Sequence, residues 1–184
     1  MENNRAALLT IPVHISIYHA AQDDPKKNTA LRLKRRGLAR IVTSTKFLPK
    51  RAIVLNPFGE IAFSPADRER IEQFGLAALD CSWEHAQKVM GGLVRGTSRC
   101  LPILIAGNPV NYGKLTKLTT AEAIAAALYI AGFKKDSELL LSIFTWGHTF
   151  FELNAMLLEN YVQAKNSAEI VEMHNRLLKI KKCN

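Results

Sequence analysis

Residues 101–133 have the sequence LPILIAGNPVNYGKLTKLTTAEAIAAALYIAGF, and this stretch is the most informative part of the chain. The apolar residues 101–106 predict a buried strand, which the turn signal Gly107-Asn108-Pro109 ends. The segment Thr119-Thr120-Ala121-Glu122 then predicts a capping box before an alanine-rich helix. The twelve residues between the predicted strand and helix exceed what a connector needs. Such a loop, held between two rigid elements, is typical of a binding loop.

The sequence around this stretch predicts an α/β fold with two unlike halves. Strands alternate with helices up to about residue 106, which favours a largely parallel sheet. The expected strands before it lie at residues 11–18, 52–55, 61–63 and 76–79. Beyond Thr119, helices are expected at about 120–131, 137–145, 148–164 and 167–181, with no strand between them. We therefore expect an α/β N-terminal domain over residues 1–100 and a mainly helical C-terminal domain over 101–184, sharing one core.

Composition excludes several classes of protein. The chain has 184 residues, 48% of them hydrophobic, as expected of an ordered globular protein. No apolar run is long enough to span a membrane, and the N-terminus lacks the features of a signal peptide, so we expect a cytoplasmic protein that makes no membrane contact. Cys81, Cys100 and Cys183 are odd in number and scattered, which indicates reduced thiols. No histidine or cysteine spacing suits zinc, and we expect no metal.

The net charge of +9 is concentrated in one segment. Residues 26–51 contain ten basic side chains and no acidic one, whereas the rest of the chain holds 15 basic and 16 acidic residues. A focused basic segment indicates a polyanionic partner, most simply a nucleic acid, although a solvated helix face is the alternative. The candidate RNA-contacting residues are Lys26, Lys27, Arg32, Arg35, Arg36, Lys46, Lys50 and Arg51.

Two nucleotide-binding motifs are excluded by their spacing. Residues 107–114 resemble a phosphate-binding loop, but Leu115 stands where the motif requires Ser or Thr. The chain also has no GxGxxG sequence. Nucleotide hydrolysis and dinucleotide chemistry therefore have no motif in this chain.

Polar turns follow two of the predicted strands, at Asp80-Cys81-Ser82 and at Gly107-Asn108-Pro109. Ligands bind at the carboxyl ends of strands in open parallel sheets, so these turns are candidate site elements. Taken alone, Asp80 is interpreted as a helix cap and Trp83 as a core aromatic. Their proximity at a strand end favours a site but does not identify its ligand.

Four segments together resemble one family closely. They are DPKKNTALRLKRRGLA, SPADRERIEQFGLAALDCSW, residues 101–133 and FTWGHTFFELN, and they cover nearly the whole chain in order. The chain is similar to the small-subunit (16S/18S) ribosomal RNA aminocarboxypropyltransferases, a family of ribosome-maturation enzymes. Its compact length resembles the archaeal members more than the eukaryotic ones.

The resemblance implies a fold that the residues alone do not reveal. The family is similar to the SPOUT class of S-adenosylmethionine enzymes and has a deep trefoil knot, a feature that is otherwise very rare. The loop after Leu101 is then expected to belong to the knot that holds S-adenosylmethionine. The resemblance also implies a monomer, and the partner that it implies is small-subunit ribosomal RNA or a pre-ribosomal particle.

The resemblance also assigns site residues. Those that it places against the cofactor are Thr29, Leu79, Leu101, Thr116 and Thr120, with Asp80, Trp83, Leu104, Tyr112 and Leu118 completing the wall of the pocket. The chain departs from the family pattern at Asn28, where Cys is common, and at Leu115-Thr116, where Pro followed by an aromatic residue is frequent.

The implied reaction transfers the 3-amino-3-carboxypropyl group of S-adenosylmethionine to an imide nitrogen of a (methyl)pseudouridine. The group that moves depends on which carbon lies in line with that nitrogen. We expect Trp83 to shield the methyl group, Thr29 to hold the amino acid end, and Asp80 to be the base. The alternatives are an RNA methyltransferase of the SPOUT type and a non-catalytic RNA-binding assembly factor.

Overall fold

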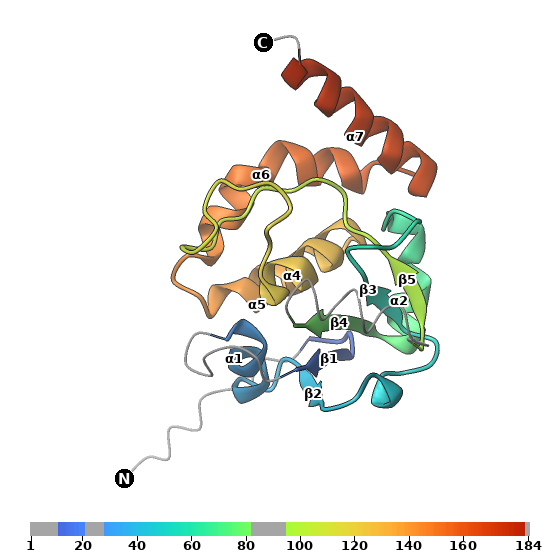
Figure 1. The fold of residues 1–184 in the computed structure, drawn as a ribbon, viewed down its shortest axis with the longest axis vertical. Coiled ribbons are helices and arrows are strands. Elements are labelled where there is room, and N and C mark those ends of the chain that lie inside the picture. Colours follow the sequence, from blue (N-terminus) through green and yellow to red (C-terminus); the bar gives the residue numbers. More distant parts are fainter. Residues whose placement is uncertain (1–10, 21–27, 82–94, 183–184) are drawn as a thin grey trace.

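The computed structural model describes residues 11–20, 28–81 and 95–182. Its centre is a five-stranded, entirely parallel sheet with the strand order β2-β1-β4-β3-β5 (Figure 1). The strands are β1 (Ile15–His19), β2 (Arg40–Val42), β3 (Ile53–Leu55), β4 (Leu76–Asp80) and β5 (Thr97–Arg99). Since β1 and β4 are neighbours, the register places His19 beside Asp80 at the carboxyl edge of the sheet.

The expected strands at 11–18, 52–55 and 76–79 are confirmed as β1, β3 and β4. The central strand β4 is apolar up to its last residue because both of its faces are buried, as is usual in a parallel sheet. The expected strand at 61–63 is wrong, since only Ala62 makes a bridge there, to Cys100.

The helices between the strands begin and end at residues that cap helices or favour turns. Asn28 caps α1 (Thr29–Arg35) by accepting a hydrogen bond from the Leu31 amide. Ser64 begins the short 3₁₀ helix η2 (Pro65–Asp67), which leads into α2 (Arg68–Phe74). Gly75 ends α2 with a φ of 83°, and a β-carbon there would lie 2.4 Å from the His14 carbonyl oxygen. Only glycine fits this turn into β4.

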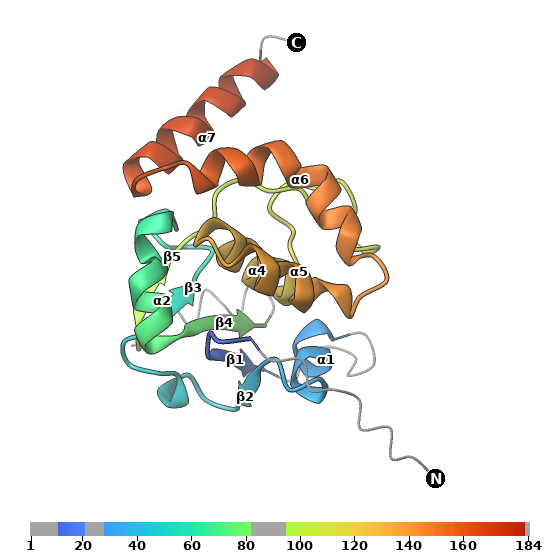
Figure 2. The same ribbon diagram turned by 180° about the vertical axis from the view of Figure 1, so that it is seen from behind.

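The C-terminal part consists of α4 (Thr120–Ile130), α5 (Lys134–Ser142), α6 (Gly147–Val162) and α7 (Ser167–Lys182). Helix α4 packs on β4 and α1, α5 and α6 pack against α4, and α7 lies at one end of the molecule (Figure 2). Most of α4 is buried, because its alanines let neighbours approach from every side. One hydrophobic core joins the sheet to these helices, from Val13 to Ile170. No helix in the described ranges is long and apolar enough to cross a membrane.

The expected strand at residues 101–106 is wrong. This segment is extended but lies outside the sheet, whose edge strand is β5, and only Ile105 makes a bridge, to Leu115. Side chains of α6 bind its backbone instead: Asn154 bonds both the amide and the carbonyl of Ile105 at 2.8 Å, and Tyr161 donates to the Ile103 carbonyl. The apolar run reflects burial against α6 rather than pairing with a strand.

The carboxylate of Glu122 holds the loop that follows this segment. It is fully buried and accepts hydrogen bonds from the amides of Gly107 and Asn108, from the Asn108 side chain, and from the amide and hydroxyl of Thr119, at 2.7–2.9 Å. The predicted capping box is confirmed. The same carboxylate therefore caps α4 and fixes the Gly107-Asn108 turn, which a sequence motif spanning four residues does not reveal.

We expect Glu122→Gln to destabilise the protein by about 3 kcal/mol, because an amide nitrogen then faces buried donors and the charge-assisted bonds are lost. Urea unfolding followed by circular dichroism measures this change. Glu138→Gln, at an exposed position of α5, is the matched control and changes the unfolding free energy by less than about 0.5 kcal/mol. Equal stabilities for the two variants would show that the loop does not depend on Glu122.

Candidate functional site

A cavity of about 410 Å³ lies at the carboxyl ends of β3 and β4, where these strands meet the loop of residues 100–119 and the start of α4. Its wall is mainly apolar and also carries threonine hydroxyls and the Asn56 side-chain amide. The lining residues are Leu55, Asn56, Pro57, Ala78, Leu79, Cys81, Cys100, Leu101, Pro102, Thr116, Leu118, Thr119, Thr120 and Ala123. The size and the mixed lining suit a small organic molecule with an apolar part and a few polar groups.

The backbone at Thr116 is unusual, and it borders this cavity. Thr116 has a φ of 60°, in the left-handed region that a threonine rarely adopts. Its amide bonds the Leu104 carbonyl and its hydroxyl bonds the Leu115 carbonyl, so its conformation is fixed from two sides. Such backbone geometry is concentrated at binding sites in proteins.

Asp80 is the centre of a hydrogen-bonded cluster next to the cavity. Its Oδ2 accepts from Asn28 Nδ2 at 2.7 Å and lies 2.6 Å from His19 Nδ1, and its Oδ1 accepts from the Thr120 hydroxyl at 2.6 Å. The cluster joins the ends of β1 and β4 to the first residues of α1 and α4. Asp80 is 9% exposed, so its charge is compensated by these partners rather than by bulk water.

The contact with Asp80 also determines that Nδ1 of the His19 ring carries a hydrogen. Because a carboxylate only accepts hydrogen bonds, the hydrogen in this contact belongs to Nδ1 of the imidazole. Nε2 of His19 has no hydrogen-bond partner among the described residues. The sequence alone gives no signal for His19, because its partner is 61 residues away and only the parallel pairing of β1 with β4 joins them.

The structure places the residues that the family resemblance selects at several locations. Those that line the cavity are Leu79, Leu101, Thr116, Leu118 and Thr120. Thr29 lies beside the start of α4, where its hydroxyl accepts from the Ala121 amide at 3.4 Å. Leu104 is fully buried in the core and Tyr112 is 61% exposed, and neither lines the cavity. Trp83 lies outside the described residues, as do Lys26 and Lys27.

Two cysteines line the cavity and were not selected from the sequence as site residues. Burial raises the pKa of the Cys100 thiol, whose sulfur donates to the Ile61 carbonyl. Cys100 therefore remains a neutral thiol at physiological pH and is a weak nucleophile. Neither Cys81 nor Cys100 forms a disulfide within the described residues.

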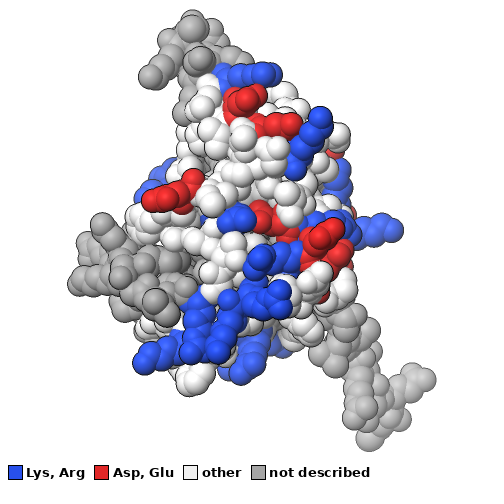
Figure 3. Space-filling view, turned by 90° about the vertical axis from the view of Figure 1, so that its right-hand side faces the viewer, with Lys and Arg blue, Asp and Glu red and all other residues white. Residues whose placement is uncertain are grey.

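The predicted RNA-contacting residues form two groups. Arg32, Arg35 and Arg36 lie on exposed positions of α1, whose first turn adjoins Asp80. Lys46, Lys50 and Arg51 lie on and after the 3₁₀ helix η1 (Thr45–Phe47), before β3. Arg51 stacks on the ring of Phe74 in α2, 3.9 Å from its centroid. On the face that carries α2 and β5, basic side chains gather in the lower part and acidic ones lie above them (Figure 3).

Comparison with known proteins identifies relatives over nearly the whole chain. A family model described as "Ribosome biogenesis protein, C-terminal" matches residues 53–178. The chain is 47% identical to the 16S rRNA aminocarboxypropyltransferase of Methanothermobacter thermautotrophicus, covering 89% of this chain and 98% of that protein. It is 44% identical to that of Methanocaldococcus jannaschii, covering 94% and 99%.

A solved structure is also similar. The SAM-dependent rRNA:acp-transferase Tsr3 from Vulcanisaeta distributa is 39% identical and superimposes with a TM-score of 0.81, covering 92% of this chain and 98% of that chain. The α/β fold with a parallel sheet and a helical C-terminal part is thus shared. The chain belongs to the 16S rRNA aminocarboxypropyltransferase (Tsr3) family.

Proposed function

We propose that this protein is an S-adenosylmethionine-dependent transferase that moves the 3-amino-3-carboxypropyl group to an imide nitrogen of a (methyl)pseudouridine in small-subunit ribosomal RNA. The observation that carries the proposal is the cavity at the carboxyl ends of β3 and β4, in a chain whose relatives are 16S rRNA aminocarboxypropyltransferases over nearly their full length. The neighbouring basic helix α1 provides cations for RNA phosphates.

The residues of the cavity suit S-adenosylmethionine. Leu55, Leu79, Leu101 and Leu118 offer apolar surface for the adenosine, and the hydroxyls of Thr119 and Thr120 offer polar contacts. When bound, the cofactor supplies an activated methylene carbon next to a positively charged sulfur. The Cys100 thiol does not compete for that carbon, because burial raises its pKa and keeps it protonated.

Proton removal is assigned to Asp80 together with His19. The imide nitrogen of the RNA forms a bond to the methylene carbon, the carbon–sulfur bond breaks with its electron pair going to sulfur, and the imide proton must leave. Asp80 already accepts three hydrogen bonds, so its oxygens are largely occupied. We infer that Asp80 orients His19 and that His19 Nε2 takes the proton, as in other Asp–His pairs.

The finer architecture is also a proposal. We infer that the loop after Leu101 is part of a trefoil knot; this is supported by the way that α4 and α6, both later in the chain, bind the loop through Glu122, Asn154 and Tyr161. We also propose the division of the chain at residue 100; it is supported by the position of all five described strands before that residue and of α4 to α7 after it. We infer that the protein is a monomer that works in the cytoplasm; the lack of a disulfide at Cys81 and Cys100 within the described residues agrees with a reducing compartment.

Incubation of the protein with small-subunit RNA and labelled S-adenosylmethionine tests the reaction. We expect the RNA to acquire label from cofactor labelled at the carboxyl carbon and none from cofactor labelled at the methyl group. Methyl label in the RNA would instead favour an RNA methyltransferase. Absence of any label, together with no cofactor binding in calorimetry, would favour a non-catalytic RNA-binding assembly factor.

We expect Asp80→Asn and His19→Gln each to lower the turnover number by about a hundredfold, the usual contribution of a positioned base. The dissociation constant of S-adenosylmethionine, measured by calorimetry, should change by less than about threefold, because neither side chain lines the cavity.

The turnover numbers of the two variants, measured separately, distinguish the roles of Asp80 and His19. Asp136→Asn on α5 is the control with wild-type kinetics. Wild-type turnover in His19→Gln would assign the proton to Asp80 alone, and wild-type turnover in Asp80→Asn would remove Asp80 from the mechanism.

RNA affinity should fall steeply with salt if the basic segment binds phosphates. For Arg36→Gln we expect the slope of log affinity against log salt to decrease in magnitude by about 0.7, the value for one contact to single-stranded RNA. Filter binding at several salt concentrations measures the slope, and Lys135→Gln on α5 is the control of equal charge. A salt-independent affinity would assign RNA binding to another surface.

A further inference from the structure

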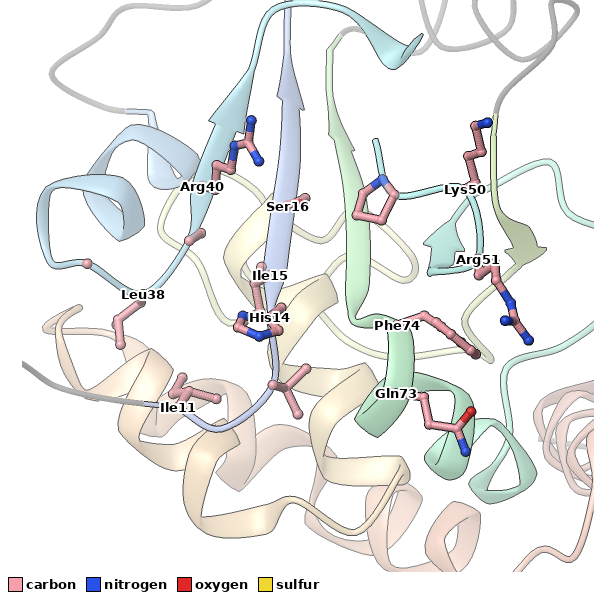
Figure 4. A pocket seen from close by; sticks show the side chains of 14 residues that line it. Ile11, His14, Ile15, Ser16, Leu38, Arg40, Lys50, Arg51, Gln73 and Phe74 are labelled. Carbon is pink, nitrogen blue, oxygen red and sulfur yellow. The ribbon is translucent and has the colours of Figure 1, made fainter. Parts of the chain in front are cut away.

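A second and larger cavity, of about 760 Å³, lies at the opposite edge of the sheet from the site described above. We call it the amino-edge cavity; its lining includes His14, Ser16, Arg40, Lys50, Arg51 and Phe74. His14 precedes β1, Arg40 begins β2, Lys50 and Arg51 precede β3, and Phe74 ends α2. Figure 4 shows Ser16 on β1 between Arg40 on one side and Lys50 and Arg51 on the other.

The charge of the amino-edge cavity is entirely positive. Arg40, Lys50 and Arg51 are exposed, and none of them has a carboxylate partner among the described residues. Within the described part of the chain, no aspartate or glutamate lines the cavity. Three cations around one hollow, with no acidic side chain between them, favour an anionic ligand.

The floor of the cavity carries a polar group that lacks a partner. Ser16 is 8% exposed, and its hydroxyl makes no hydrogen bond with any described residue. It faces the cavity beside Arg40, its neighbour in the register of β1 and β2. No buried side-chain oxygen or nitrogen among the described residues lacks a partner, so this hydroxyl is open to the cavity and can bond an oxygen-rich ligand there.

We propose that the amino-edge cavity binds a nucleotide of the substrate RNA, at a distance along the strand from the one that is modified. This proposal rests on the proposed function for its choice of RNA. The volume suits one nucleotide, the phosphate is bound by Arg40 and Lys50, and the Ser16 hydroxyl bonds a polar atom of the sugar or base.

Two neighbouring features favour an RNA strand over a free nucleotide. The Arg51 guanidinium lies over the Phe74 ring, 3.9 Å from its centroid, and the side of the guanidinium away from that ring is available for a base. Phe47 is 64% exposed on η1, next to Lys46, and an exposed aromatic ring beside a lysine is a platform for an unpaired base. Arg51 and Phe47 both lie in the segment that leads into β3, so an RNA strand that leaves the cavity meets further contacts.

Ser16→Ala and the double variant Arg40→Gln/Lys50→Gln test the proposal in the full-length protein. We expect Ser16→Ala to weaken binding of a small-subunit RNA fragment about fivefold without lowering the urea unfolding midpoint, because the hydroxyl has no protein partner to lose. The double variant should weaken binding more than about tenfold and reduce the salt slope by about 1.4, the value for two phosphate contacts.

Lys135→Gln/Lys165→Gln removes the same number of charges from exposed positions outside the cavity and is the matched control. Calorimetry with S-adenosylmethionine should give wild-type affinity for every variant, because its cavity lies at the other edge of the sheet. Transferase activity is measured separately. If the variants lose RNA binding and the wild-type protein shows no transferase activity, the cavity proposal is supported and the proposed function is rejected.

Wild-type RNA affinity in Ser16→Ala and in the double variant, in a protein that is an active transferase, would overturn the proposal. Uridine monophosphate is the probe for the alternative ligand, a free nucleotide with the same phosphate, sugar and base. If it binds the cavity in NMR titrations and the RNA affinities of the variants equal that of wild type, the site serves a free nucleotide and the proposal is wrong.

Discussion

The buried carboxylate of Glu122 is the interaction on which the candidate site depends most. It caps α4 and at the same time binds the turn at Gly107 and Asn108, so one side chain fixes the loop relative to the most buried helix of the protein. Helix α4 also brings Thr120 to Asp80, and it begins at the cavity wall with Thr119 and Thr120. The position of that helix therefore sets the geometry of the Asp80 cluster and of the cavity. A charge that is removed from water must have such partners, and they leave little freedom to move.

The sheet separates two surfaces with different chemistry. The carboxyl edge holds a mainly apolar cavity with a cluster of polar groups at its side, as is usual for ligand sites of parallel sheets. The amino edge holds a larger hollow surrounded by cations. Helix α1 runs between the two edges, because it follows β1 and precedes β2, and its exposed arginines lie along that path. A polyanion that follows these cations therefore reaches from one edge to the other.

Local signals in the sequence predict the helices of the C-terminal part better than the strands. The Thr119–Glu122 box begins α4 as expected, because capping depends on a few adjacent residues, whereas β2 and β5 were not among the expected strands. Residues 101–106 were mistaken for a strand, because burial against α6 gives the same apolar pattern as burial in a sheet. His19 and Ser16 could not be selected, since their importance comes from strand neighbours far away in the sequence.

The attachment of the loop to α6 has a consequence for synthesis of the chain. Asn154 and Tyr161 bind the backbone at Ile105 and Ile103, and a β-carbon at Gly107 would lie 2.6 Å from the Phe150 amide nitrogen, so the loop fits closely against a helix that is translated about fifty residues later. The five strands have all left the ribosome before these partners emerge. The nascent chain can therefore assemble its sheet early, but the candidate site is complete only after α6 has been translated.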